Sequence, residues 1–332
     1  MVPNNGELEV ICQRLKSSSR VLVTSHLLPD GDSVGSVIAL TEALQRAGLE
    51  ARAVQAEPVP DMYKFLEVNV KMEPLSGDDS GAVVVLDCTD TDRLGEELKK
   101  VAEQADLLVN IDHHVSNTGF GHLNLVDVKA AATGEIVYDL VRVLGVEISP
   151  PMATALYTAI VTDSGSFQYE NTCPRSLRVA AELLELGADH ALLRANLWEN
   201  QPLECLLVLR NVLNSLSLDP DGRVAWISLD RKAYDGLHLK SEHCEGLINF
   251  PRSIAGVEVA MFFRETEPGT VKVGLRSKSL VDVNELAARF GGGGHPRAAG
   301  CTLKGRLDEV IETVVRAAQD MVQRGESRGR AD

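Results

Sequence analysis

Three consecutive titratable side chains, Asp112, His113 and His114, occur in the stretch NIDHHVSN, residues 110–117. Core packing does not call for such a triplet, because buried charged and imidazole groups need polar partners. Carboxylates and imidazoles are, however, common ligands of divalent metal ions in proteins. The triplet is therefore a candidate metal site if other parts of the chain supply further ligands.

Metal-capable side chains also occur in three other short stretches, SHLLPDGDSVG, VVVLDCTD and AIVTDSGSF. In the first stretch, Pro29 and Gly31 favour a tight loop that can turn its side chains toward one point. Taken alone, each stretch has an ordinary explanation: Asp32 or Ser33 could cap a helix, and a strand-end aspartate is often a solvated turn residue. Together they favour bound cations, because so many unpaired carboxylates at one edge would repel one another. The metal-capable residues are His26, Asp30, Asp32, Asp87, Asp112, His113, His114 and Asp163.

The types of these side chains indicate the kind of metal. Aspartate and histidine without cysteine suit Mn²⁺, Mg²⁺ or Fe²⁺ better than a structural zinc ion. Their number suits two ions rather than one. Two ions about 3.5–4 Å apart form the clamp that phosphatases and nucleases use.

The elements that must position these residues follow from the apolar pattern of the first half of the chain. Short, continuously apolar runs alternate with amphipathic stretches, which is typical of a parallel sheet covered by helices on both faces. Ligands of such doubly wound sheets bind at the carboxyl ends of the strands, where the metal-capable stretches begin. The predicted strands are residues 20–26, 51–56, 82–87 and 107–112, and the predicted helices are 33–48, 133–145, 150–163 and 174–189.

The pattern changes near residue 190. The next 27 or so residues look helical throughout and are predicted to link two domains, and the segments after them alternate like antiparallel strands. We expect an N-terminal α/β domain over 1–190, a helical linker over 191–217, a smaller α/β domain over 218–326 and a disordered tail over 327–332. The second domain has predicted strands 223–230, 257–266 and 270–278, predicted helices 281–290 and 306–322, and the run GGGGHPRAAG over 291–300.

The composition argues against some classes of binding partner and some cellular locations. The 33 Lys plus Arg residues stand against 48 Asp plus Glu, and a net charge of −15 argues against capture of long duplex nucleic acid. The six cysteines form no CxxC pair, which favours a reducing cytoplasm. The N-terminus lacks a signal pattern, and no apolar run approaches the roughly 20 residues of a membrane span, so no membrane association is expected.

The four metal-capable stretches, in this order, resemble the four motifs of the DHH phosphoesterase superfamily, and GGGGHPRAAGC resembles the signature of the DHHA1 domain. The compact DHH–DHHA1 arrangement is similar to the NrnA-type branch, whose members hydrolyse very short RNAs and 3′-phosphoadenosine 5′-phosphate (pAp). The resemblance implies a DHH domain, a DHHA1 domain that binds substrate, and a homodimer formed through the first domain.

The resemblance also implies roles for the site residues. Two divalent ions are implied, with Mn²⁺ as the expected metal and Mg²⁺, Co²⁺ or Fe²⁺ as alternatives. Catalysis is assigned to Asp87, which would bridge the ions, to Asp112, which would orient an imidazole, and to His114, which would face the substrate. The implied ligands are His26, Asp30 and Asp87 for the first ion, and Asp32, Asp87, His113 and Asp163 for the second.

Substrate contacts are expected in the glycine run and in nearby basic residues. Consecutive glycines let backbone N–H groups approach an anion, although such a run is more often only a flexible loop. Arginine suits a terminal phosphate as a bidentate donor. The candidate contacts, besides His114, are Arg93, Arg276, Ser277, Gly293, Gly294, His295 and Arg297.

The expected reaction is hydrolysis of RNAs of about two to five nucleotides to 5′-mononucleotides, and of pAp to AMP, by attack of a metal-activated water on phosphorus. One alternative is a phosphodiesterase for cyclic di-AMP or the linear dinucleotide pApA. A pyrophosphatase or exopolyphosphatase is disfavoured by the glycine run, and a RecJ-like exonuclease by length and charge. A nucleotide-sensing module without turnover is also conceivable, but it would be expected to have lost ligands.

Overall fold

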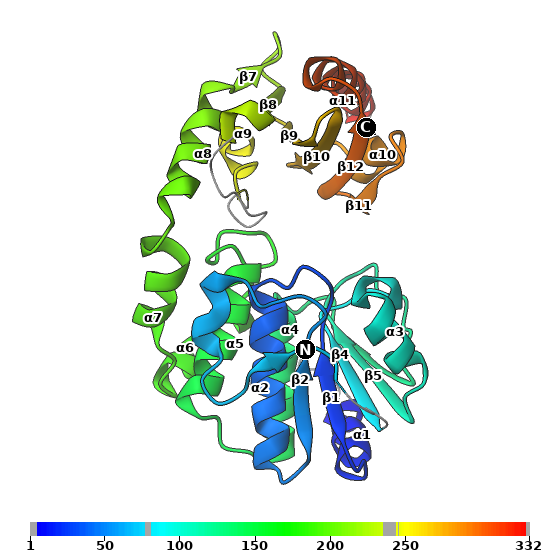
Figure 1. The fold of residues 1–332 in the computed structure, drawn as a ribbon, viewed down its shortest axis with the longest axis vertical. Helices are drawn as coiled ribbons and strands as arrows, with labels where there is room; N and C mark the ends of the chain where they lie inside the picture. The colour runs from blue at the N-terminus through cyan, green and yellow to red at the C-terminus, as the bar shows by residue number, and fades with distance from the viewer. Residues whose placement is uncertain (1–4, 77–80, 235–243, 245, 330–332) are drawn as a thin grey trace. The chain divides into compact units, whose positions relative to one another are not determined.

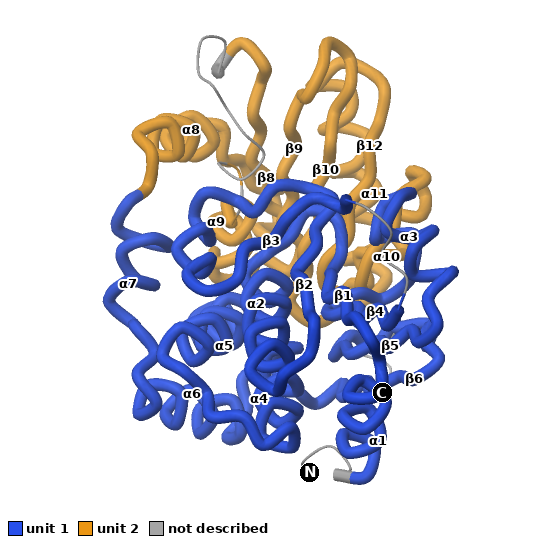
Figure 2. The backbone as a smooth tube through the Cα atoms, turned by 60° about the horizontal axis from the view of Figure 1, so that its bottom comes forward, with its two compact units in different colours: residues 1–200 blue, residues 201–332 orange. Residues whose placement is uncertain are grey.

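The computed structural model describes residues 5–76, 81–234, 244 and 246–329 (Figure 1). The chain divides into two compact units, residues 1–200 and residues 201–332, coloured separately in Figure 2. The division falls within the segment that the sequence predicts as a helical linker.

Unit 1 is built on six strands that are parallel throughout, in the order β3-β2-β1-β4-β5-β6. The predicted doubly wound, mainly parallel sheet is therefore confirmed. The sequence reading missed β3 and β6, because both are short edge strands without a continuous apolar run. The strands are β1 Val21–Thr24, β2 Ala51–Val54, β3 Met72–Glu73, β4 Ala82–Leu86, β5 Leu107–Asp112 and β6 Leu123–Val126.

Helices cover both faces of this sheet because successive strand residues point to opposite sides. Val84 and Val109 belong to the larger core with α1, α2, α4 and α5, whereas Val83 and Val85 pack with α3 on the other face (Figure 1). The helices of unit 1 are α1 Asn5–Lys16, α2 Gly31–Arg46, α3 Glu96–Glu103, α4 Thr133–Leu144, α5 Pro150–Asp163, α6 Pro174–Glu185 and α7 His190–Arg194, with short 3₁₀ segments at Asp61–Leu66 and Thr91–Leu94 and a π turn at Ala195–Glu199.

The start of α2 corrects the sequence reading. Asp30, rather than Asp32 or Ser33, is the N-cap: its carboxylate accepts a 3.0 Å hydrogen bond from the Ser33 amide, and the Asp30 amide donates to Ser33 Oγ at 2.9 Å. This reciprocal capping box begins the helix at Gly31, two residues before the predicted start. Asp32 consequently lies in the first helical turn, where its carboxylate accepts hydrogen bonds from another segment instead of capping its own helix.

A glycine allows α2 to pack closely against α5. A Cβ atom at Gly35 would collide with the carbonyl oxygen of Ala155. We expect Gly35→Ala to lower the free energy of unfolding by about 1–3 kcal/mol, because the two helices must separate. The matched control is Gly325→Ala in α11, where the new methyl group would have an ordinary 3.7 Å contact with the Leu280 oxygen. That control should gain about 0.5–1 kcal/mol. Urea unfolding of both variants tests the pair, and equal effects would contradict the packing argument.

Unit 2 has a mixed sheet in the order β11-β12-β10-β9-β8-β7. The expectation of an antiparallel sheet is wrong at one pair, because β8 and β9 run parallel. Parallel neighbours need a longer connection than a hairpin, and the described part of this one contains the short helix Asn249–Ser253. The strands are β7 Ser217–Leu218, β8 Val224–Leu229, β9 Val259–Glu267, β10 Thr270–Ser277, β11 Gly293–His295 and β12 Ala298–Lys304. The helices are α8 Leu203–Asn214, α9 Asn249–Ser253, α10 Val283–Ala288 and α11 Leu307–Gly329, with a 3₁₀ turn at Arg231–Tyr234.

Three further expectations for this half of the chain need correction. The predicted linker is not helical throughout, since it breaks at residues 200–202, where Pro202 cannot continue a helix. Part of the glycine run is a strand, β11, which pairs with β12. Helix α11 continues to Gly329, so the expected disordered tail is helical up to that residue, and 330–332 lie outside the described residues. Among the helices described, none has the length and apolar character needed to cross a bilayer.

Candidate metal and substrate site

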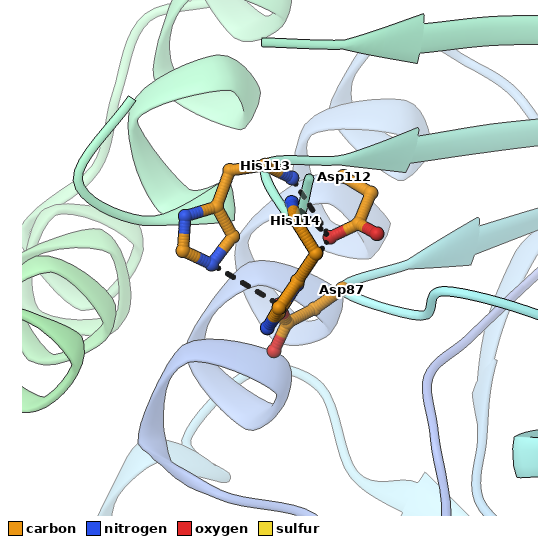
Figure 3. Close-up of side chains that lie close together, drawn as sticks. All are labelled: Asp87, Asp112, His113 and His114. Carbon is orange, nitrogen blue, oxygen red and sulfur yellow. Dashed lines mark hydrogen bonds and ion pairs between the residues drawn. The ribbon is translucent and has the colours of Figure 1, made fainter. Parts of the chain in front are cut away.

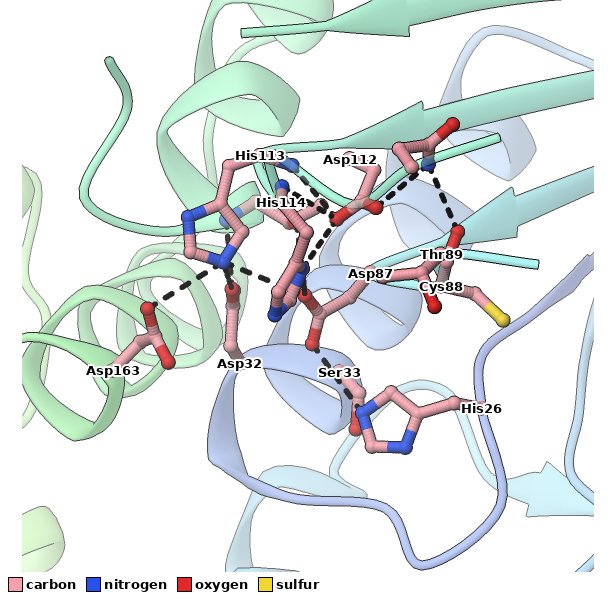
Figure 4. A network of polar contacts seen from close by, with 12 residues as sticks. His26, Asp32, Ser33, Asp87, Cys88, Thr89, Asp112, His113, His114 and Asp163 are labelled. Atoms are coloured by element: carbon pink, nitrogen blue, oxygen red, sulfur yellow. Dashed lines mark hydrogen bonds and ion pairs between the residues drawn. The ribbon is translucent and has the colours of Figure 1, made fainter. Parts of the chain in front are cut away.

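The metal-capable side chains of unit 1 converge at the carboxyl ends of neighbouring strands. His26 lies two residues beyond β1, Asp87 directly follows β4, and the Asp112 triplet ends β5. Because β1 and β4 are adjacent at the point where the strand order reverses, the loops after them open toward one place. Asp32 in α2 and Asp163 at the end of α5 complete the group (Figure 4).

The first set of contacts surrounds His113. Its Nε2 atom lies 3.8 Å from Asp32 Oδ2, 3.7 Å from Asp87 Oδ1 and 3.5 Å from Asp163 Oδ2. Its Nδ1 atom lies 3.2 Å from the Ala130 carbonyl oxygen, which can only accept, so Nδ1 donates to that oxygen and Nε2 is the ring nitrogen that faces the carboxylates. Nε2 is buried and has no hydrogen-bond partner among the residues that the structure describes. A cation bound to Nε2 and to the three carboxylates would give this buried nitrogen a partner.

The second set shares Asp87. His26 Nε2 lies 3.5 Å from Asp87 Oδ2 and 3.9 Å from Asp30 Oδ2, and His26 Nδ1 lies 2.6 Å from the carbonyl oxygen of Leu27. The two Asp87 oxygens thus face different imidazoles, one in each set (Figure 3 shows the His113 side). Ligand atoms of His26, Asp30 and Asp87 all lie within 4.8 Å of one another, and so do those of Asp32, His113 and Asp163. Asp87 also lies within that distance of ligand atoms of Asp112, His113 and His114. These oxygen and nitrogen donors are of the kind that bind divalent cations, and Asp87 lies beside both histidines.

The charges of the cluster are unbalanced without cations. Burial and the neighbouring charges of Asp87 and Asp163 raise the pKa of Asp32 well above its usual range. Burial, with the charges of Asp87 and Asp30, likewise raises the pKa of Asp163 to about 7. Burial opposes ionisation of Asp87 too, but its hydrogen bond to His26 and the charges of the imidazoles outweigh burial and lower its pKa. Divalent cations would remove the repulsion that raises the other two.

Asp112 has a different role in the geometry. Its Oδ1 accepts from the His113 amide at 2.7 Å and lies 2.7 Å from His114 Nδ1, while Oδ2 accepts from Asn117 Nδ2 at 2.7 Å. These partners occupy the carboxylate and fix the ring of His114. Burial lowers the pKa of His114, but the hydrogen bond to Asp112 and the charges of Asp87 and Asp112 outweigh it and raise the pKa to about 9.

The sequence reading missed the segment between β6 and α4. The amides of Thr133 and Gly134 donate to the two oxygens of Asp32 at 2.7 and 2.9 Å, and Thr133 Oγ1 donates to Asp87 Oδ1 at 3.2 Å. The adjacent Ala130 supplies the carbonyl that orients His113. Because backbone atoms make most of these contacts, the residue types carry little signal. A Thr-Gly pair at a predicted helix start was the one available clue.

The candidate substrate contacts in unit 2 meet at one end of its sheet. Arg276 of β10 and His295 of β11 are both register partners of Ala298 in β12, so the three side chains share one face. The Ser277 amide donates to the Arg297 carbonyl at 3.2 Å, which closes the same end of the sheet. Arg297 Nη1 donates to the Val281 carbonyl at 2.9 Å, so one of its donors is used within the unit.

The remaining candidates occupy two places. Gly293 and Gly294 lie in β11, and the Gly294 amide donates to Asn284 Oδ1 at 2.9 Å instead of being left for a ligand. Arg93 belongs to unit 1, where its carbonyl accepts from the Leu27 amide at 2.6 Å and so lies beside the loop that carries His26. The structure thus brings Arg93 close to the metal-capable loops and the other basic candidates together in unit 2.

A buried glutamate that the sequence reading missed supports this end of unit 2. Glu258 Oε1 accepts from three successive amides, those of Ser279 at 3.0 Å, Leu280 at 2.5 Å and Val281 at 3.0 Å. Such a row of N–H groups is an anion-binding backbone arrangement, here filled by the protein's own carboxylate. Glu258 therefore fixes the turn that follows Ser277 and that accepts the Arg297 hydrogen bond.

Comparison with known proteins agrees with these features. The family model described as DHH family, N-terminal domain, matches residues 20–160, and that of the DHHA1 domain matches residues 232–323. The bifunctional oligoribonuclease and PAP phosphatase NrnA of Thermus thermophilus is 36% identical, over 96% of this chain and 95% of that protein. The NrnA protein of Bacillus subtilis is 27% identical, over 85% of this chain and 89% of that protein.

Among solved structures, an exopolyphosphatase-related protein from Bacteroides fragilis has a TM-score of 0.90 and 24% identity, covering 98% of this chain and 99% of that one. At this identity the likeness concerns the fold alone. The expected relationship rests on the two family models together with the Thermus thermophilus relative, and it is confirmed by them. The chain belongs to the DHH phosphoesterase family, in the form that carries a DHHA1 domain.

Proposed function

We propose that this protein is a metal-dependent phosphoesterase that hydrolyses very short RNAs to 5′-mononucleotides and pAp to AMP. One observation supports the chemistry above all others: the buried Nε2 of His113, which has no hydrogen-bond partner within the described part of the chain, faces the carboxylates of Asp32, Asp87 and Asp163. The choice of substrates is inferred from similarity, because relatives that align over most of the chain are named as oligoribonucleases and PAP phosphatases.

Two divalent ions would be held by the two sets that share Asp87. When bound, such a pair neutralises phosphate charge and lowers the pKa of a water molecule that attacks phosphorus. Other groups of the chain orient the side chains of the site: the Thr133 and Gly134 amides hold Asp32, and Asp112 holds the ring of His114. We assign His114 to the phosphoryl oxygens or the leaving oxygen, where a cationic imidazole stabilises developing negative charge. The proposed ligands are His26, Asp30 and Asp87 for one ion, and Asp32, Asp87, His113 and Asp163 for the other.

Unit 2 would bind the substrate's terminal phosphate. Support comes from the shared face of Arg276 and His295 and from the close spacing of β11 and β12, which the glycines permit. Ser277 and Arg297 close the same end of the sheet. Arg93 is a weaker candidate, in unit 1. A phosphate-binding site of this kind would favour short substrates. The terminal phosphate makes up a large share of the contacts of a dinucleotide and a small share of those of a long strand.

Replacing Arg276 with Gln should raise KM for pApA and pAp by about 10-fold or more and leave kcat nearly unchanged. The reason is that a hydrogen bond to a charged group contributes about 1.5–3 kcal/mol, and this contact would be the same in the ground and transition states. Lys272→Gln, an exposed position on the same strand, is the matched control. A fall in kcat without a change in KM would contradict a role in substrate binding.

A single substrate panel tests the function. Purified protein with Mn²⁺ is given pAp, pApA, cyclic di-AMP, a short RNA series and an RNA of about two dozen nucleotides, and AMP or nucleotide release is measured. We expect release from pAp and from the shortest RNAs, and its loss in His113→Ala. Absence of metal-dependent release would refute the proposal. Equal turnover of the longest RNA would refute the preference for short substrates, and faster turnover of cyclic di-AMP would favour a second-messenger phosphodiesterase.

The proposal includes three finer points. Mn²⁺ is the proposed metal because the donors are carboxylates and imidazoles without thiolates. A homodimer is proposed from the resemblance, and a cytoplasmic location from cysteines that the structure leaves as free thiols. Metal competition assays and light scattering measure the first two.

A further inference from the structure

The segment from Asp127 to Glu135, which runs from the end of β6 into the first turn of α4, carries groups that orient the metal-capable side chains. Its Ala130 carbonyl accepts from His113, and the Thr133 amide and hydroxyl donate to carboxylates of both proposed metal sets. A shift of this segment would therefore move several donor atoms together. The contacts that hold this segment in place should therefore affect the metal affinity of the site as well as the folding of the chain.

A single guanidinium fixes both ends of that segment. Arg175, in the first turn of α6, lies 3.7 Å from Asp127 Oδ2 and 3.4 Å from Glu135 Oε2, and its Nη2 donates to the Glu135 carbonyl at 3.3 Å. The same Nη2 donates to Asp139 Oδ2 at 2.5 Å, one turn further along α4. The planar fork of arginine can serve three carboxylates at once, which a lysine ammonium cannot do with the same geometry.

The burial of these partners makes Arg175 important to their arrangement. The Glu135 side chain is fully buried, and its Oε1 accepts from the Ala131 amide at 3.3 Å, within the segment itself. Burial raises the pKa of Glu135, while the Arg175 charge acts in the opposite direction. A buried carboxylate without its cation tends to turn toward water or take up a proton. Either change would release the Ala131 amide.

The loop before α6 makes a parallel connection to a metal-capable residue. Asn171, four residues before Arg175, donates from Nδ2 to the Ala131 carbonyl at 2.9 Å and to the Asp163 carbonyl at 3.1 Å. The start of α6 therefore holds the β6–α4 segment at Ala131 and at its two ends, and it holds Asp163 as well. Asn171 Nδ2 also lies 3.4 Å from Asp163 Oδ2, a proposed ligand oxygen, whereas Arg175 reaches the proposed ligands through the segment 127–135.

From these contacts we propose that Arg175 is a positioning residue that sets the divalent-metal affinity of the site by holding the segment 127–135 in place. This inference rests on the proposed metal-dependent function. Residues that orient metal ligands commonly change metal affinity by about 10- to 100-fold when they are replaced. Arg175 contacts the segment that orients the ligands rather than the ligands themselves, so we expect an effect near the lower end of that range.

The test compares Arg175→Gln, Arg175→Lys and Arg178→Gln, an exposed arginine on the same helix that serves as the matched control. Mn²⁺ binding to each purified protein is measured directly from the electron paramagnetic resonance signal of free Mn²⁺. We expect about 10-fold weaker binding in Arg175→Gln, a smaller loss in Arg175→Lys and none in the control. In activity assays, the Mn²⁺ concentration for half-maximal rate should rise while kcat at saturating Mn²⁺ largely recovers.

Two outcomes would overturn the inference. A folded Arg175→Gln protein with wild-type Mn²⁺ affinity would mean that Arg175 supports the fold alone. If that variant does not fold, Arg175→Lys provides the test, because lysine keeps the positive charge beside Glu135 but lacks the planar guanidinium. Unchanged Mn²⁺ affinity of Arg175→Lys would equally refute the inference. Failure of the proposed function would look different, since the wild-type protein itself would then release no nucleotide from pAp or short RNAs in the presence of Mn²⁺.

Discussion

Replacing Asp87 with Asn should lower kcat on pApA and pAp by about 10³-fold, the largest loss that we expect from one substitution. Asp87 faces His26 and His113 with different oxygens, so it is the residue shared by the two proposed metal sets. Removing its charge should cost several kcal/mol of transition-state stabilisation, at about 1.4 kcal/mol per tenfold in rate. Calorimetry should show that at least one of two Mn²⁺ ions is lost.

Asn is the right replacement because of the backbone at this position. Asp87 has a φ of 55°, in the left-handed region that asparagine tolerates and alanine does not. Asp87→Asn therefore tests the charge without adding backbone strain. The control is Asp106→Asn, an exposed carboxylate just before β5, at the opposite end of that strand from the site. Activity of Asp87→Asn within about tenfold of wild type would contradict a shared ligand.

The two neighbouring histidines of the triplet should behave differently when each is replaced with Ala. His113→Ala should lose Mn²⁺ affinity and activity together, because its Nε2 faces three carboxylates. His114→Ala should keep nearly normal Mn²⁺ affinity while kcat falls by about 10²–10³-fold, the usual contribution of one group that stabilises developing negative charge. Measuring Mn²⁺ binding and kcat on the same preparations separates the two effects.

The next residue in the chain provides the control for this pair. Val115 is 84% exposed, and Val115→Ala should change neither metal affinity nor kcat. Equal loss of Mn²⁺ binding in both histidine variants would show that His114 is itself a ligand. Ligation by His114 is geometrically feasible, because its Nδ1 lies 3.5 Å from Asp87 Oδ1, besides its 2.7 Å contact with Asp112.

Much of the fold could be predicted because its signal is local. The strands that became β1, β4 and β5 are continuous apolar runs, and such runs alternating with helices predict a covered parallel sheet. Edge strand β6 and the two-residue β3 gave no such signal, since an edge strand needs no apolar run on both sides. The parallel pairing of β8 with β9 was missed for a related reason: alternation shows that one face is buried, not which direction a neighbour runs.

The metal-capable residues could be named before the fold was known, because carboxylates and imidazoles at predicted strand ends are a property of residue type and spacing. The atoms that contact one another could be identified only in the folded structure. It showed that Asp30 caps α2, that backbone groups of Ala130, Thr133 and Gly134 hold the donors, and that Arg175 holds that segment. Backbone amides and carbonyls are the same in every residue, and contacts across 100 or so positions leave no local pattern, so these parts of the site could not be found before the chain was folded.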